Sequence, residues 1–224
     1  MTQHRLAVLL RDAVLRGSHP EDDGLAELCE PWRAGVEGVV AFAGHAVVCL
    51  HGPEPAARLD SALARLGPAG YGPGRGGATD ARVVVALAGA GRVDSLDLVL
   101  GATGTGRAPE HLVDAKGLDH PRAHLAASWR SDTQVLVDRR DPDAALVTRS
   151  VGIGGLAEVS IEVAPASRGR GRARDLLGEA RGLVAVDDVV LAAVAPGNAA
   201  SLRAAWSAGF RPVAAVQLWS SGVA

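Results

Sequence analysis

The chain has 224 residues, of which 48% are hydrophobic, 21% are charged and 3% are aromatic, and its formal net charge is −2. This composition is typical of a globular protein whose core consists mainly of Ala, Val and Leu. The near balance of acidic and basic residues excludes the strongly basic surface of a nucleic-acid-binding protein. The length allows one large domain or two small ones.

The two cysteines, Cys29 and Cys49, lack the spacing of a metal site, and two thiols do not make a disulfide scaffold. We interpret each as a small buried hydrophobic residue and expect no metal. No segment approaches the roughly 20 apolar residues that span a bilayer. The first 16 residues carry Arg5, Arg11 and Asp12, which argues against a secretory signal. We therefore expect a cytoplasmic protein without a membrane or nucleic-acid partner.

The first half of the chain predicts an α/β region. Apolar residues at helical spacing predict a helix over residues 4–16, and apolar runs on both sides of Gly44 predict strands within 36–50. Residues 54–66 are typical of a helix, 67–77 of a loop and 95–100 of a strand, followed by a turn-rich segment from 101 to 109. Periodicity leaves residues 81–90 open between helix and strand.

The second half predicts strands and helices in alternation. Pro121 marks the start of a helix. Strands are predicted over 134–137, 144–151, 157–163, 188–194 and 211–219, with helices over 170–182 and 198–208. This order is typical of a mixed α/β (α+β) sheet covered by helices. We place a domain boundary near residue 110, giving 1–110 and 111–224, although the two parts could share one sheet.

One segment carries a clear chemical signal. Residues 157–163 alternate strictly, with Val159 and Ile161 on one face and Glu158, Ser160 and Glu162 on the other. The strand is followed by a turn that contains Gly169 and Gly171 and then by a helix. Free backbone N–H groups at a helix N-terminus bind anions, glycines let a phosphate approach closely, and four neighbouring arginines add positive potential. We predict a site for a di- or triphosphate group here. The arginines are Arg168, Arg170, Arg172 and Arg174.

The turn resembles a known family signature. Residues 168–173, Arg-Gly-Arg-Gly-Arg-Ala, are similar to the (Gln/Arg)-x-x-Gly-x-(Gly/Ala) motif of GNAT acyltransferases. Asn198 at the start of a helix and the Gly209-Phe210 pair after it resemble the second half of the same family, and the resemblance covers about residues 118–219. It implies a mostly antiparallel sheet flanked by helices, an acyl-CoA cosubstrate, most commonly acetyl-CoA, an amine acceptor of unknown size and a possible homodimer.

The resemblance also assigns binding residues. Backbone amides of the glycine turn would hold the pyrophosphate of coenzyme A, and the pantetheine arm would lie along the strand that ends at Val163. Asn198 caps its helix and could touch this arm, although a purely structural role is an equal alternative. The cofactor-binding candidates are Val163, Arg168, Gly169, Arg170, Gly171, Arg172, Ala173 and Asn198.

Catalysis is less clearly encoded. Transfer to an amine needs a base or a water relay, and Glu158 and Glu162 are the candidates, with pairing to arginines as the structural alternative. Ser201 is a candidate for orienting a water or the thiolate. Many family members carry a Tyr four residues before the Gly-Phe pair, where this chain has Ala205. We therefore retain a non-catalytic acyl-CoA-binding or regulatory module as the second hypothesis.

Three other features carry less weight. Residues 101–106 contain three glycines after a strand, but Pro109 and the lack of a second acidic strand end favour a plain turn over a dinucleotide loop. His120 and His124 favour a helix cap and a surface histidine over half a metal site. His45 lies in an apolar segment and is interpreted as a hydrogen-bonded core residue.

Overall fold

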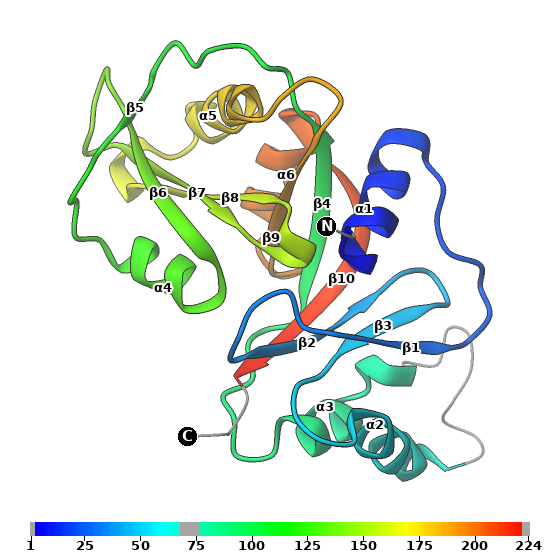
Figure 1. Ribbon diagram of the computed structural model, residues 1–224. Coiled ribbons are helices and arrows are strands. Elements are labelled where there is room, and N and C mark those ends of the chain that lie inside the picture. The colour runs from blue at the N-terminus through cyan, green and yellow to red at the C-terminus, as the bar shows by residue number, and fades with distance from the viewer. Residues whose placement is uncertain (1–2, 68–76, 221–224) are drawn as a thin grey trace.

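One ten-stranded sheet runs through the molecule, and helices cover both of its faces (Figure 1). The structure is a computed structural model that describes residues 3–67 and 77–220. Its strands are β1 (Ala26–Cys29), β2 (Val36–Ala41), β3 (Ala46–Cys49), β4 (Asp97–Thr103), β5 (Leu112–Asp114), β6 (Ser131–Asp138), β7 (Ala145–Val151), β8 (Ala157–Val163), β9 (Val189–Val194) and β10 (Arg211–Ser220). Its helices are α1 (Arg5–Arg16), α2 (Pro55–Leu63), α3 (Ala81–Ala88), α4 (Pro121–Trp129), α5 (Arg172–Ala180) and α6 (Ala199–Ser207).

The sheet order is β1-β3-β2-β10-β4-β9-β8-β7-β6-β5. The pairs β1–β3 and β8–β9 are parallel, and the other neighbouring pairs are antiparallel. The predicted fold class, a mixed and mostly antiparallel sheet flanked by helices, is therefore confirmed. The sheet continues across residue 110, because β4 from the first half lies between β10 and β9 from the second.

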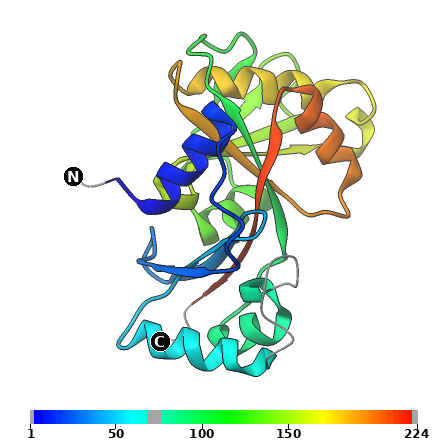
Figure 2. The same ribbon diagram turned by 90° about the vertical axis from the view of Figure 1, so that its right-hand side faces the viewer.

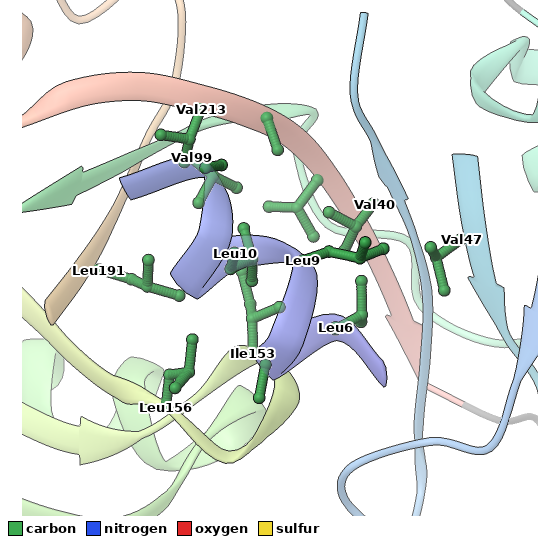
Figure 3. Close-up of a cluster of buried hydrophobic side chains, with 14 of the residues drawn as sticks. Leu6, Leu9, Leu10, Val40, Val47, Val99, Ile153, Leu156, Leu191 and Val213 are labelled. Atoms are coloured by element: carbon green, nitrogen blue, oxygen red, sulfur yellow. The ribbon is translucent and has the colours of Figure 1, made fainter. Parts of the chain in front are cut away.

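Helix α1 packs on the centre of the sheet and joins its two halves (Figure 3). His4 accepts a hydrogen bond from the Leu6 N–H and caps the helix, which ends at Gly17 with a φ of +64°. Its apolar stripe, with Leu6 and Leu10 fully buried, contacts side chains from both halves of the sheet. Those partners include Val40, Val47, Val99, Leu191 and Val213.

The opposite face is covered by two helix pairs, α2 with α3 and α5 with α6 (Figure 2). Val39 packs with α2 and α3, whereas its neighbour Val40 packs with α1, as expected for alternation along a strand. In the same way Leu100 packs with α5, whereas Val99 packs with α1. Among the described residues, no helix is long and apolar enough to span a membrane.

Some elements differ from those expected. Strands β1 and β5 were not predicted, and β4 continues to Thr103 into the segment expected to be turns. The ambiguous segment is helix α3, because the Asp80 side chain caps it and its apolar face packs on α2 and the sheet. Residues 68–76 of the expected loop lie outside the described residues.

Candidate active site

Strands β8 and β9 separate and leave a cavity between them. Their parallel pairing consists of Ala157 with Val190 and Glu158 with Leu191. Beyond this point β8 pairs only with β7, and β9 pairs with β4 up to Val194. A cavity of about 210 Å³, called the smaller cavity below, is lined by residues 159–161 of β8 and 192–195 of β9 and the turn after it. The edge of β8 that faces β9 is therefore available for a ligand.

A second cavity, called the larger cavity, continues from the end of β8 to the glycine turn. Its volume is about 580 Å³, and it is lined by residues 161–163, by the turn and first residues of α5, and by the first turns of α6. The two cavities share four lining residues, so together they form one path along the edge of β8. The shared residues are Arg122, Ile161, Asn198 and Ser201.

The glycine turn presents free backbone N–H groups to the larger cavity. Gly169 and Gly171 have φ values of +77° and +76°, a left-handed conformation that favours glycine, and Gly171 is the N-cap of α5. The amides of residues 169–174 donate to no acceptor among the described residues, and no side chain caps the helix. Free amides at a helix N-terminus are suited to bind an anion, and the anion site stays a prediction.

The four arginines of the turn differ in their contacts. Arg172 forms ion pairs with buried Asp138 at 2.7 Å and with Asp141 at 3.7 Å, and Arg174 pairs with Asp175 at 2.7 Å. Arg168 is exposed, and its Nε donates to the carbonyl of Val163 at 3.1 Å. Exposed Arg170 forms no ion pair within the described part of the chain, and its charge remains uncompensated beside the free amides.

Helix α6 forms the opposite wall of the path. The side-chain oxygen of Asn198 accepts a hydrogen bond of 3.1 Å from the Ser201 N–H and so caps the helix, as predicted. Asn198 and Ser201 both line the two cavities. Ala205, which stands where a Tyr is common in the family that the sequence resembles, lines the smaller cavity and is almost fully buried.

The two predicted bases lie in different surroundings. Glu158 is 2% exposed, forms an ion pair with Arg130 and lies outside the lining of either cavity. Glu162 lines the larger cavity with a half-exposed side chain, 3.6 Å from Arg122. Arg122 also donates to the carbonyl of Ile161 at 3.1 Å. Both glutamates thus pair with arginines, which was the structural alternative.

An acidic pair that sequence reasoning missed lies at the far end of the path. Asp94 and Asp97 line the smaller cavity together with Trp129 and Arg130. The hydroxyl of Ser95 donates to Asp97 at 2.7 Å. Burial raises the pKa of Asp97, and the neighbouring charge of Asp94 acts in the same direction. The sequence signal was a carboxylate at the start of an otherwise apolar strand.

The features given less weight have ordinary structural roles. The amides of Gly104, Thr105 and Gly106 donate to main-chain carbonyls at 2.8–3.0 Å, so this loop has no free amides for a phosphate. His120 caps α4, and exposed His124 contacts Asp119 at 2.7 Å. Buried His45 lies 3.0 Å from Asp23 and 3.3 Å from Glu27.

Comparison with known proteins gives partial similarities. No family model and no curated protein matches the chain. Among solved structures, the chain is similar to a GNAT-family protein from Novosphingobium aromaticivorans, with 25% identity over 60% of this chain and 69% of the other and a TM-score of 0.38. It is also similar to a GNAT-family acetyltransferase from Colwellia psychrerythraea, with 15% identity over 58% of this chain, and to a GCN5-related N-acetyltransferase from Sphaerobacter thermophilus, with 20% identity over 58%. Both have TM-scores of 0.38, and the chain spans 57% and 52% of their lengths. These partial similarities are to GNAT-family structures, the family that the motifs of the sequence resemble.

Proposed function

We propose that this protein is an acyl-CoA-dependent N-acyltransferase that transfers an acyl group, most commonly acetyl, to an amine. One observation carries the proposal: a continuous path along the edge of β8 has free amides and arginines at one end and two carboxylates at the other. The first end suits the pyrophosphate of coenzyme A, and the second suits an acceptor that arrives as an ammonium ion.

The chain's residues fit the pyrophosphate and the pantetheine arm of the cosubstrate. The amides of residues 169–173, with Arg168 and Arg170 beside them, would bind the pyrophosphate. The unpaired edge of β8 that ends at Val163 would bind the pantetheine arm, and Asn198 lies beside the same path. The Arg122 guanidinium that now donates to the carbonyl of Ile161 would compete with the arm for this acceptor.

Bound acyl-CoA supplies the thioester, and the protein would control the proton. The ammonium ion would give one proton to a base and become the attacking amine. As its nitrogen forms the C–N bond, the C–S bond would break, and the second proton would leave the nitrogen and end on the departing thiolate of coenzyme A. We assign acceptance of the first proton to Asp97, because its side chain lines the cavity where the strands separate. The pKa of Asp97 is raised, and a higher pKa makes a carboxylate a more effective base. A backbone N–H of the free β8 edge would stabilise the negative charge that develops on the carbonyl oxygen. Glu162 and Ser201 also line the path and stay candidates for relaying the proton through water.

The test is the thermal stability of the protein with acetyl-CoA. A ligand at about 100 times its dissociation constant adds about 2.7 kcal/mol to the free energy of unfolding, which raises the Tm by about 5–10 °C for a chain of this size. Gly171→Glu places a negative charge and a strained side chain at the free amides and should abolish the shift. Gly178→Glu is the matched control, because it adds the same charge two turns along α5, where an added Cβ meets no atom within 4 Å. Equal shifts in all three proteins would refute the site.

The second hypothesis, a non-catalytic acyl-CoA-binding module, is favoured by two observations. Ala205 leaves the usual position of the acid without a hydroxyl, and Glu158 is held by Arg130. Such a module would show the same thermal shift but no release of coenzyme A with any amine. Turnover measurements therefore separate the two functions after binding has been established.

A further inference from the structure

Three potential metal ligands from distant parts of the chain meet at the N-terminus of α1. His4 caps α1, Cys29 ends β1 and Cys49 ends β3. The two strands are parallel, and Cys29 is the direct register partner of Cys49, so both side chains lie on the face that α1 covers. Spacing along the chain does not indicate this cluster, because its members are 25 and 20 residues apart and each thiol on its own is typical of a small hydrophobic residue.

The distances agree with the dimensions of a tetrahedral zinc site. The imidazole Nε2 of His4 lies 3.7 Å from the sulfur of Cys29, and the ligand atoms of all three residues lie within 4.8 Å of one another. With Zn–S bonds of about 2.3 Å and Zn–N bonds of about 2.0–2.1 Å, tetrahedral geometry places neighbouring ligand atoms about 3.5–3.8 Å apart. The three atoms need to move by about 1 Å or less to surround one ion.

We propose that His4, Cys29 and Cys49 form a binding site for Zn²⁺. Two sulfur ligands and an imidazole favour a thiophilic d¹⁰ cation over Mg²⁺ or Ca²⁺, which prefer oxygen. Three protein ligands leave the fourth position of a tetrahedral ion for water or an exogenous ligand. Cys49 is fully buried, whereas His4 and Cys29 are half-buried, so an ion reaches the site from their side.

Metal binding would break the hydrogen bonds that His4 now forms, and this sets its free-energy cost. The Leu6 N–H donates to Nδ1 at 3.1 Å, which places the ring proton on Nε2, where it donates to the carbonyl of Glu30 at 2.8 Å. A cation on Nε2 replaces this proton, and a neutral ring then carries its proton on Nδ1, which ends the Leu6 bond. Losing a helix cap costs far less free energy than a structural zinc site contributes. Trp32, in edge contact with the imidazole at 6.2 Å between ring centroids, restrains the ring at this position.

The thiolate is the form of cysteine that binds a metal, so Zn²⁺ binding at this site would release the thiol protons of Cys29 and Cys49.

The site is testable on the untagged chain of 224 residues, reduced and freed of metal with a chelator that is then removed. Titration with Co²⁺ should give the near-ultraviolet absorption of sulfur-to-cobalt charge transfer, and one equivalent of Zn²⁺ should remove it. Cys49→Ser should weaken Zn²⁺ binding by about 100-fold or more, because even residues behind the ligands account for about 10–100-fold. His4→Ala provides a second ligand variant at a half-buried position, for the case that Cys49→Ser does not fold.

Two controls make the result specific. His124→Ala removes an exposed histidine far along the chain and should leave Zn²⁺ affinity unchanged. The thermal unfolding of each metal-free variant shows whether it is folded before metal is added. Stoichiometric, chelator-resistant Zn²⁺ uptake that His4→Ala or Cys49→Ser weakens supports the site. Failure of the folded wild type to bind one Zn²⁺, or equal binding by folded ligand variants, overturns it.

Discussion

The guanidinium of Arg130 forms an ion pair with the buried carboxylate of Glu158, and the same arginine lines the smaller cavity together with Asp97. One cation therefore connects one of the two glutamates that the sequence offers as a base with the aspartate that we propose as the base. Because Glu158 pairs with Arg130 and lies outside the lining of either cavity, we expect Glu158 to act mainly on stability.

Glu158→Gln should destabilise the protein by about 3 kcal/mol, because removing one partner of a buried ion pair leaves the other charge without compensation. Urea unfolding measures this change. Glu162→Gln is the matched control and should cost less than about 1 kcal/mol, since its pair with Arg122 is half-exposed. Unchanged stability of Glu158→Gln together with lost turnover would return the role of the base to Glu158.

Asp97→Asn should lower kcat/KM by about 10²–10⁴-fold while leaving the thermal shift with acetyl-CoA unchanged, because the residue lines the acceptor end of the path. In the wild type, kcat/KM should fall as the pH drops through the raised pKa of Asp97, because only the carboxylate accepts a proton. Ser95→Ala should move this acidic limb to higher pH, since the Ser95 hydroxyl stabilises the carboxylate. A pH profile that is the same in all three proteins would exclude Asp97 as the base.

Asp138 gives a prediction for stability at low pH. Arg140 lowers the pKa of this fully buried carboxyl by hydrogen bonding, and Arg172 acts in the same direction. A carboxyl group whose pKa is lower in the folded state stabilises that state at a pH above its unfolded-state pKa of about 4. This stabilisation is lost as the pH falls through the pKa of the folded state. Asp138→Asn should therefore lose about 1.5–3 kcal/mol at pH 7, and its difference from the wild type should shrink below pH 4. A difference that stays constant from pH 7 to pH 3 would contradict this assignment.

The arginines of the glycine turn should contribute unequally to binding. Arg170→Ala should weaken acetyl-CoA binding in a salt-dependent way, because its charge is uncompensated beside the free amides. Arg174→Ala should have a smaller effect, since Asp175 already pairs with Arg174 at 2.7 Å. Calorimetric titrations at two salt concentrations make the comparison. Equal losses in both variants would show that the ion pair does not hold Arg174 away from the ligand.

The sequence predicted local features well. The strand over residues 157–163, the glycine turn and a helix directly after it follow from neighbouring residues. The strand has the predicted bounds, whereas α5 begins at Arg172 and not at residue 170. The Asn198 cap was predicted for the same reason. These elements contain most of the proposed phosphate site, so that site could be inferred from the chain alone.

Features that depend on distant contacts were missed. Strand β1 is short, lies at the sheet edge and carries Glu27, so its period gives little signal, and only its pairing with β3 reveals it. The burial of Asp97 depends on the elements packed around it, and the meeting of Cys29 with Cys49 depends on a parallel register. Local residue patterns in one sequence do not specify which strands become neighbours in the sheet.

The most direct test of the proposed function is the release of free coenzyme A from acetyl-CoA across a panel of small amines, amino acids and peptide N-termini, measured for the wild type and for Asp97→Asn. We expect amine-dependent release by the wild type that rises with pH through the acidic limb, and release that is about 10²-fold or more lower in Asp97→Asn. Saturable acetyl-CoA binding without amine-dependent release at any pH would contradict the proposed transferase activity and would support a binding module instead.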